Sequence, residues 1–109
     1  MTINWHGVIP ALMTEMKRDG ALDLPATGRH IESCLNAGCE GVVMLGILGE
    51  NSSLSNDEKE AVVRTAIDAT NGRAPTIVGI GEYTTDLAIA QARRMQKPGQ
   101  SHEFQVARI

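Results

Sequence analysis

The stretch Gly41-Val42-Val43-Met44-Leu45-Gly46-Ile47-Leu48-Gly49-Glu50, continued by Asn51-Ser52-Ser53-Leu54-Ser55-Asn56-Asp57-Glu58, decides the fold. It begins as an unbroken apolar run with two β-branched valines, which is typical of a strand buried on both faces in a parallel sheet. The two glycines that follow allow a tight turn, and Ser55 with Glu58 has the spacing of a capping box that starts a helix. This order of strand, glycine turn and capped helix places residues 46–53 at the carboxyl end of a strand, where α/β folds hold their ligand sites.

The same theme occurs three times along the chain. Apolar runs begin at Gly7, Gly41 and Pro75, so 34 residues separate each run from the next. Each period has room for one strand, one loop and one helix, which is the size of a βα unit. Pro10 lies inside the first run and removes a ladder hydrogen bond, but the run is still interpreted as a strand.

Three helices are expected, from about Asp23 to Gly38, from Ser55 to about Asn71, and from Thr84 or Thr85 to about Lys97. Their predicted inward faces are Leu24, Ile31, Cys34 and Leu35 in the first, Val62, Val63, Ala66, Ile67 and Thr70 in the second, and Ala88, Ile89, Ala92 and Met95 in the third. Alternating βα units predict parallel strands with right-handed crossovers. Two architectures fit this pattern: a (β/α)8 barrel, and an open flavodoxin-like sheet that binds an anion at its switch point.

Composition narrows the class of protein. The chain has 109 residues, a net charge of −3 and 42% hydrophobic residues, which suits one small core. No cluster of lysine and arginine exceeds two adjacent residues, which argues against a nucleic-acid partner or an anionic membrane surface. No apolar run approaches the ~20 residues of a membrane span and no signal-peptide pattern opens the chain, so a cytoplasmic location is expected.

The sequence gives little support for a metal site or a cofactor site. Cys34 and Cys39 are too few for a disulfide framework. His30 and Cys34 stand four residues apart and could share a helix face, but no third or fourth ligand is in view, so Cys34 is expected in the core and His30 as a partly exposed helix residue. Gly79-x-Gly81 lacks the third glycine of a dinucleotide fingerprint. We therefore expect no metal and no cofactor.

A family resemblance rests on the central stretch. Gly46-x-x-Gly49-Glu50, followed by Leu54-Ser55 and Glu58, resembles the Gly-Thr-Thr-Gly-Glu…Leu-Ser-x-x-Glu signature of the dihydrodipicolinate synthase / N-acetylneuraminate lyase family. Residues 7–14, 19–23 and 78–81 extend the resemblance over roughly the first ninety-five residues. It implies a class I, Schiff-base-forming (β/α)8 TIM barrel that acts on pyruvate or a related 2-oxo acid. Such a barrel needs ~250 residues, so the expected fold is α/β, a partial barrel of the first three βα units.

The two ends of the chain differ in how they fit this family. Residues 1–97 are expected to form the three βα units, whereas residues 98–109 are expected to be an irregular tail. The family would have an apolar fourth strand there, but this segment is polar and has no apolar run of four residues. Either the sequence is cut short, or the reading frame changed near Lys97, and the downstream DNA would distinguish the two.

The glycine turn is the expected substrate site. Backbone N–H groups in such a turn, at the positive end of the following helix, can hold a carboxylate. The candidate substrate-binding residues are Gly46, Ile47, Leu48, Gly49 and Glu50, with the amides of Leu48 and Gly49 as donors and Ser52 or Ser53 beside them. Glu50 either orients its neighbours or hydrogen-bonds the backbone where the helix starts, and the second role is favoured.

The resemblance implies that two threonines add hydroxyl donors to this turn, and that one of them belongs to a proton relay. Ile47 and Leu48 replace both threonines. The relay cannot exist in that form, which disfavours dihydrodipicolinate synthesis itself. It favours a relative with a bulkier or more apolar 2-oxo-acid substrate.

No catalytic residue is expected in this chain. A Schiff-base lysine needs a desolvated position at a strand end, whereas Lys17, Lys59 and Lys97 all have polar neighbours and are expected at the surface. The resemblance places the lysine and the proton-shuttling tyrosine beyond residue 109, and Tyr83 does not match that tyrosine.

Two functional interpretations follow. The first is the N-terminal part of a pyruvate-type aldolase or lyase, which is inactive alone and homo-oligomeric when complete. The alternative is a non-enzymatic α/β fragment that self-associates or needs a completing partner.

Overall fold

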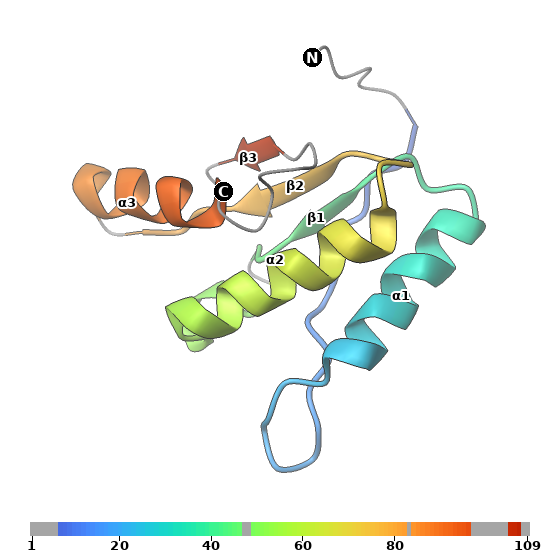
Figure 1. The fold of residues 1–109 in the computed structure, drawn as a ribbon, viewed down its shortest axis with the longest axis horizontal. Coiled ribbons are helices and arrows are strands. Elements are labelled where there is room, and N and C mark those ends of the chain that lie inside the picture. Colours follow the sequence, from blue (N-terminus) through green and yellow to red (C-terminus); the bar gives the residue numbers. More distant parts are fainter. Residues whose placement is uncertain (1–6, 47–48, 83, 97–104, 108–109) are drawn as a thin grey trace.

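The computed structural model describes residues 7–46, 49–82, 84–96 and 105–107. Its elements in chain order are α1 (Leu24–Asn36), β1 (Val42–Met44), the 3-10 turn η1 (Asn51–Ser53), α2 (Asn56–Thr70), β2 (Thr76–Gly79), α3 (Thr85–Gln96) and β3 (Gln105–Ala107) (Figure 1). The three strands form one sheet in the order β1-β2-β3, and both pairings are parallel. The prediction of parallel strands separated by helices is confirmed.

The first apolar run lies beside β1 without becoming a regular strand. Ala11 forms a parallel bridge to Val43. The Val43 N–H donates to the Pro10 C=O at 2.8 Å, and the Leu12 N–H donates to the Val43 C=O at 2.9 Å. Pro10 has no N–H of its own, so the ladder cannot extend, and the predicted first strand is reduced to this bridge. The run nevertheless extends the sheet by one parallel segment.

The helices all pack on one face of this sheet. One core cluster joins Ile31 of α1, Val62 of α2 and Met95 of α3 to alternate residues of the strands, Val42 and Met44 among them. Val43, which points to the opposite face, is only half-buried. A doubly wound sheet has helices on both faces and reverses its strand order, whereas here each segment lies next to the one before it in the chain. The flavodoxin-like alternative is therefore wrong, and the partial barrel is confirmed.

The helix boundaries follow their local signals. The Asp23 carboxylate accepts a hydrogen bond from the Ala26 N–H at 3.1 Å and caps α1, and the chain leaves this helix through Gly38 at φ +99°. Ser55 caps α2 with the full capping box, in which Ser55 and Glu58 each accept a hydrogen bond from the other's backbone N–H. All three predicted helices are confirmed.

The inward face of α3 differs from the prediction at one position. Ile89 is 47% exposed, whereas Gln91 is buried at 5%. The buried stripe runs through Ala88, Gln91, Ala92 and Met95, which is the i, i+3, i+4, i+7 spacing of one helix face. Ile89 lies one position away from that stripe and therefore faces outward.

The C-terminal segment contains a strand that the sequence did not predict. Residues 105–107 form β3, in which Val106 pairs with Val78 and Ala107 with Gly79. The expectation of an irregular tail is wrong for these three residues. They are too few for a periodicity signal, and backbone pairing with β2 creates the strand. The division of the chain at Lys97, and its cause, stay predictions.

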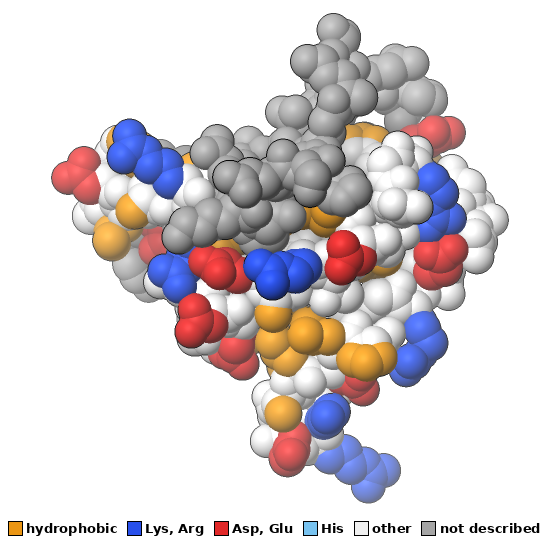
Figure 2. All heavy atoms as spheres, viewed as in Figure 1, with side chains coloured by type: hydrophobic (Ala, Val, Ile, Leu, Met, Phe, Trp, Pro, Cys, Tyr) orange, Lys and Arg blue, Asp and Glu red, His pale blue; other side chains and the backbone are white. Residues whose placement is uncertain are grey.

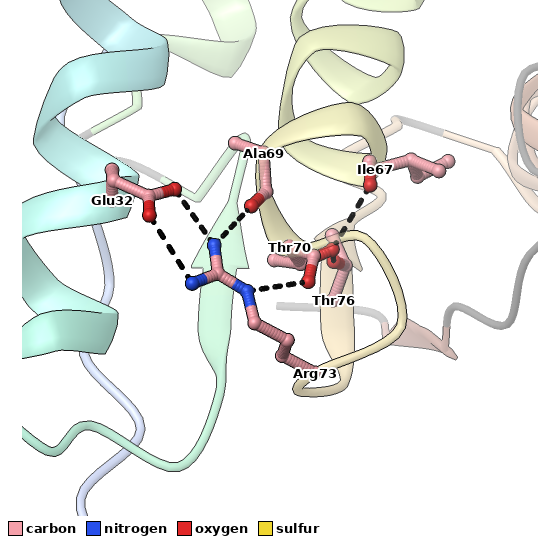
Figure 3. A network of polar contacts seen from close by, with 6 residues as sticks. All are labelled: Glu32, Ile67, Ala69, Thr70, Arg73 and Thr76. Atoms are coloured by element: carbon pink, nitrogen blue, oxygen red, sulfur yellow. Dashed lines mark hydrogen bonds and ion pairs between the residues drawn. The ribbon is translucent and has the colours of Figure 1, made fainter.

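A polar network fastens α1 to the end of α2 (Figure 3). The Arg73 guanidinium donates to both Glu32 carboxylate oxygens, at 3.1 and 2.7 Å, and also to the C=O groups of Ala69 and Thr70. Its hydrogen bonds lower the pKa of Glu32 below the usual value, and Glu32 in turn raises the pKa of Arg73. This bidentate pair links the two helices at the protein surface, next to the core residues that they share.

Hydrophobic side chains also reach the surface. Figure 2 shows a group of them near the start of α1, between charged side chains. In the first run, Met13 is 53% exposed between the buried Leu12 and Thr14, as expected for a segment whose side chains alternate between two faces, and Val8 at the start of the run is 67% exposed. Within the described residues, no helix has the length and apolarity needed to cross a bilayer.

Candidate functional site

The glycine turn after β1 is compact and buried. Gly46 and Gly49 are both buried, and the Gly49 N–H donates to the Gly46 C=O at 3.1 Å. The turn is flanked by Leu45 at φ +60° and Glu50 at φ +59°, a backbone conformation that L-residues adopt rarely. Backbone strain of this kind costs energy and collects at functional sites, so it marks this turn as a candidate site.

Close backbone contacts explain the glycines. A Cβ added to Gly49 would lie 2.8 Å from the Leu45 nitrogen. A Cβ added to Gly79, at the end of β2, would lie 2.5 Å from the Leu45 oxygen. Both distances are shorter than van der Waals contact, so only glycine fits at either position. The turn is therefore in direct backbone contact with the end of the neighbouring strand.

Thr14 ties the turn to the end of the first run. Its hydroxyl donates a 2.8 Å hydrogen bond to the Gly49 C=O, and the Thr14 side chain is itself buried, at 5% exposure. The ends of the first run, β1 and β2 thus meet at one edge of the sheet. In a (β/α)8 barrel this edge is the mouth, where active sites lie.

One of the backbone N–H groups expected to bind a carboxylate is already used within the turn. The Gly49 N–H, one of the two expected donors, donates to the Gly46 C=O in this conformation, and carboxylate binding by the turn stays a prediction. A glycine turn uses its last amide to close on itself, which sequence alone does not reveal. Ile47 and Leu48 lie outside the described residues. Ser52 and Ser53 are exposed, and the Ser53 N–H donates to the Glu50 C=O at 2.9 Å.

Glu50 does not hydrogen-bond the backbone at the start of the helix, which is the role that the sequence favoured. It is exposed and precedes η1, but its side chain makes no capping hydrogen bond there. The start of α2 is capped by Ser55 instead. The expectation that Glu50 hydrogen-bonds the backbone where the helix starts is therefore wrong, and the role of orienting neighbouring groups remains a proposal.

The described lysines differ in their exposure to solvent. Lys17 is exposed, as expected, and Lys97 and Tyr83 lie outside the described residues. Lys59 is buried at 6% exposure, and its amine lies 3.7 Å from a Glu82 carboxylate oxygen. The prediction of a surface position for Lys59 is wrong, because it precedes Val62 and Val63 by three and four positions on the buried stripe of α2. Neither described lysine lies on a strand.

The structure also contains a cleft that lies away from the turn. A cleft of about 440 Å³ is lined by Asn56 at the start of α2, by Glu82 and by α3 residues that include Gln91 and Arg94. Arg94 also joins the two helices, with Nη2 2.9 Å from an Asp57 carboxylate oxygen. No described residue of the glycine turn lines this cleft, so it is separate from the candidate carboxylate site.

The pair of possible metal ligands on α1 is not assembled into a site. His30 Nδ1 lies 3.3 Å from a Glu15 carboxylate oxygen, and both side chains are about one-third exposed, at 33% and 38%. Among the described residues, no group of three or more histidine, cysteine, aspartate or glutamate side chains is placed to hold a metal ion.

Comparisons with known proteins support the barrel. Residues 4–106 match the Dihydrodipicolinate synthetase family. A 4-hydroxy-tetrahydrodipicolinate synthase of Chelativorans sp. (strain BNC1) is 38% identical over 95 residues, which is 87% of this chain and 32% of that protein. The corresponding synthase of Xanthomonas axonopodis pv. citri is 40% identical over 100 residues, or 92% of this chain and 33% of that protein.

A solved structure gives the same result. A prophage protein of the dihydrodipicolinic acid synthase family from E. coli K12, in complex with pyruvate, superposes with a TM-score of 0.78 at 35% identity, covering 85% of this chain and 31% of that one. The chain thus spans about a third of the length of the relatives it matches. With its parallel strands, its helices on one face and its glycine turn at the barrel mouth, the chain belongs to the dihydrodipicolinate synthetase family and corresponds to an N-terminal portion of it.

Proposed function

We propose that this chain supplies the first three βα units of a Schiff-base-forming aldolase or lyase that acts on a pyruvate-like 2-oxo acid. The observation that carries the proposal is the hydrogen bond from Thr14 to Gly49, which holds the turn at the edge where the carboxyl ends of the strands meet. Gly46, Ile47, Leu48, Gly49 and Glu50 are the proposed substrate-binding residues. The complete protein is proposed to work as a cytoplasmic homo-oligomer.

The turn is proposed to hold the substrate carboxylate. With the Gly49 amide engaged by Gly46, the remaining candidate donors are the amides of Ile47 and Leu48. Successive backbone N–H groups in a tight turn can form a concave nest that binds an anion. The side chains of Ile47 and Leu48 add apolar contact, which favours a 2-oxo acid with a larger or more apolar substituent than pyruvate.

The 109-residue chain by itself is proposed to be inactive. A Schiff base forms when an unprotonated lysine amine attacks the substrate carbonyl. Lys59 is buried, yet it lies on a helix and its amine is paired with a Glu82 carboxylate oxygen at 3.7 Å, so it is not placed at a strand end. Lys17 is exposed to water. The lysine and the tyrosine that the chemistry needs are proposed to come from later strands.

Borohydride trapping tests the proposed inactivity. The chain is incubated with pyruvate and sodium borohydride, and its mass is then measured. We expect no covalent adduct on Lys17, Lys59 or Lys97, and an adduct on any of them would overturn the proposed inactivity.

A chimera supplies the missing units and tests the proposed function. Residues 1–96 of this chain replace the matching part of the Xanthomonas synthase, and the chimera is trapped with pyruvate and with a 2-oxo acid that has a longer apolar side chain. We expect an adduct with both acids and stronger trapping with the longer one. Failure of a folded chimera to trap either acid, while the parent synthase traps pyruvate, would overturn the proposed function.

A second candidate function is a non-enzymatic fragment that self-associates or needs a completing partner. It is favoured by the exposure of Val8 and Met13 on the first run, at the end of the described sheet. We expect the chain to sediment as more than a monomer, and Met13→Lys to reduce this association. Ile89→Lys, at a comparably exposed position on α3, is the control and should have little effect. A monomer with a sharp two-state unfolding curve would contradict this candidate.

A further inference from the structure

The two cysteines lie at the C-terminal end of α1, where the chain closes on itself. The Cys39 N–H donates to the Cys34 C=O at 3.0 Å, and the Gly38 N–H donates to the Leu35 C=O at 3.1 Å. Gly38 has a φ of +99°. These two hydrogen bonds and the left-handed glycine define a Schellman motif.

The motif brings the backbones of the two cysteines together. Its outer hydrogen bond links the residue three positions inside the helix end to the residue two positions beyond the cap, and side chains at these two positions commonly pack against each other. Here both positions are cysteine. Burial raises the pKa of the Cys34 thiol, and the neighbouring Cys39 thiol raises it further.

Both thiols are free and partly exposed, so a small reagent can reach them. A disulfide needs Cα atoms roughly 4.4–6.8 Å apart. The backbone hydrogen bond from Cys39 to Cys34 holds the two residues close together. Cys39 precedes β1 and therefore lies at the opposite end of this strand from the glycine turn. A reaction of the two cysteine thiols therefore takes place away from the proposed carboxylate site.

We propose that Cys34 and Cys39 form a redox modification site, at which a small-molecule disulfide such as oxidised glutathione converts the two thiols into an intrachain disulfide. The inference is independent of the proposed function. It concerns the connection between α1 and β1, which the disulfide would restrain at the helix end.

The reaction takes place in two exchanges. The Cys39 thiol loses its proton to solvent and its thiolate attacks one sulfur of the small disulfide, releasing one small thiolate and leaving a mixed disulfide on Cys39. Cys34, disfavoured as the first nucleophile by its raised pKa, then loses its proton and attacks the Cys39 sulfur, releasing the second small thiolate. The two protons pass to the released thiolates. The protein loses two hydrogen atoms, and the small disulfide is reduced to two thiols.

Equilibration in glutathione buffers tests the proposal on the full 109-residue chain. The tryptic peptide of residues 30–59 contains both cysteines, so an intrachain disulfide appears as the loss of two hydrogen atoms within that one peptide. We expect this species to dominate for the wild-type chain and to revert with a reducing agent. Cys34→Ser and Cys39→Ser should each stop at a mixed disulfide with glutathione.

A pair of glycine variants tests the role of the motif. Gly38→Ala strains the left-handed position, and the reduced chain can relieve that strain by opening the motif, whereas the disulfide requires the motif to be closed. We expect the equilibrium constant for disulfide formation to fall about tenfold. Gly72→Ala, at φ +77° after α2 and likewise with open space around its Cβ, is the matched control and should leave the constant unchanged.

Three outcomes would overturn the proposal. The wild-type chain could hold two glutathione adducts without releasing the second, or it could form disulfides only between peptides of different chains. Gly72→Ala could also lower the constant as much as Gly38→Ala. Dominant intrachain disulfide together with a selective effect of Gly38→Ala would support it.

Discussion

The Thr14 hydroxyl donates a 2.8 Å hydrogen bond to the Gly49 C=O across 35 positions of the chain, and both residues are buried. Thr14→Val keeps the shape of the side chain but leaves this carbonyl without its donor. We expect the chimera with the Xanthomonas synthase to lose about 1–3 kcal/mol of unfolding free energy, because an unsatisfied buried acceptor costs that much. Urea denaturation measures the loss.

Thr65→Val is the control for this prediction. The Thr65 hydroxyl donates to the Ala61 C=O at 2.9 Å, within α2. That carbonyl lies four residues before Thr65 and already has a helical partner, so we expect a change of less than about 0.5 kcal/mol. Equal losses for the two variants would mean that the contact between Thr14 and Gly49 does not hold the turn.

Restoring hydroxyl groups to the turn should strengthen carboxylate binding. In the chimera, Ile47→Thr and Leu48→Thr each add one donor, worth about 1 kcal/mol, or roughly fivefold in affinity. The pyruvate concentration that gives half-maximal borohydride trapping should therefore fall. Ser53→Thr is the control, because it keeps a hydroxyl on an exposed side chain and adds no donor. Unchanged half-saturation in the double variant would place the carboxylate elsewhere.

Removing one partner of the Lys59–Glu82 pair should destabilise the fold more than replacing both charged groups. Lys59→Met leaves Glu82, whose side chain is 20% exposed, without its partner at 3.7 Å. We expect a loss of about 1–3 kcal/mol, since the remaining carboxylate is partly desolvated. Adding Glu82→Gln should recover most of it. Thermal unfolding of the two single variants and the double variant gives the coupling energy, and strictly additive losses would show that the two groups do not interact.

The contact between Glu32 and Arg73 should make stability depend on pH in the acid range. Arg73 lowers the pKa of Glu32 below 4.5, so the folded state binds the proton more weakly than the unfolded chain does. The stabilisation is complete above that usual value and is lost as the pH falls through the lowered one. The difference in denaturation midpoint between wild type and Glu32→Gln should therefore be present at neutral pH and disappear in acid.

Arg73→Lys separates the charge from the hydrogen-bonding geometry of that pair. Lysine keeps the positive charge but cannot form the two parallel bonds to Glu32 or reach Ala69 and Thr70 in the same way. NMR titration should show the Glu32 pKa rising toward its usual value in this variant. A Glu32 pKa that stays as low as in wild type would mean that charge alone accounts for the shift.

Local sequence signals were sufficient for the helices and for the family. Asp23, Ser55 and Glu58 act on backbone groups within three positions of themselves, so they mark the helix starts without reference to the rest of the fold. The glycines of the central stretch indicate that two backbone segments come close together there, and the structure shows that the contact is with the Leu45 backbone. The spacing of three apolar runs was enough to predict parallel βα units.

Only the tertiary structure decided which long-range partners meet. The burial of Lys59 and Gln91, and the outward position of Ile89, depend on how far each helix is rotated against the sheet. The engagement of the Gly49 amide and the pairing of residues 105–107 with β2 depend on backbone geometry that no residue type encodes by itself. Side-chain periodicity and capping act over a few residues, whereas burial and strand pairing are set by segments far apart in the chain, and that is why the sequence determined the elements and the fold determined their contacts.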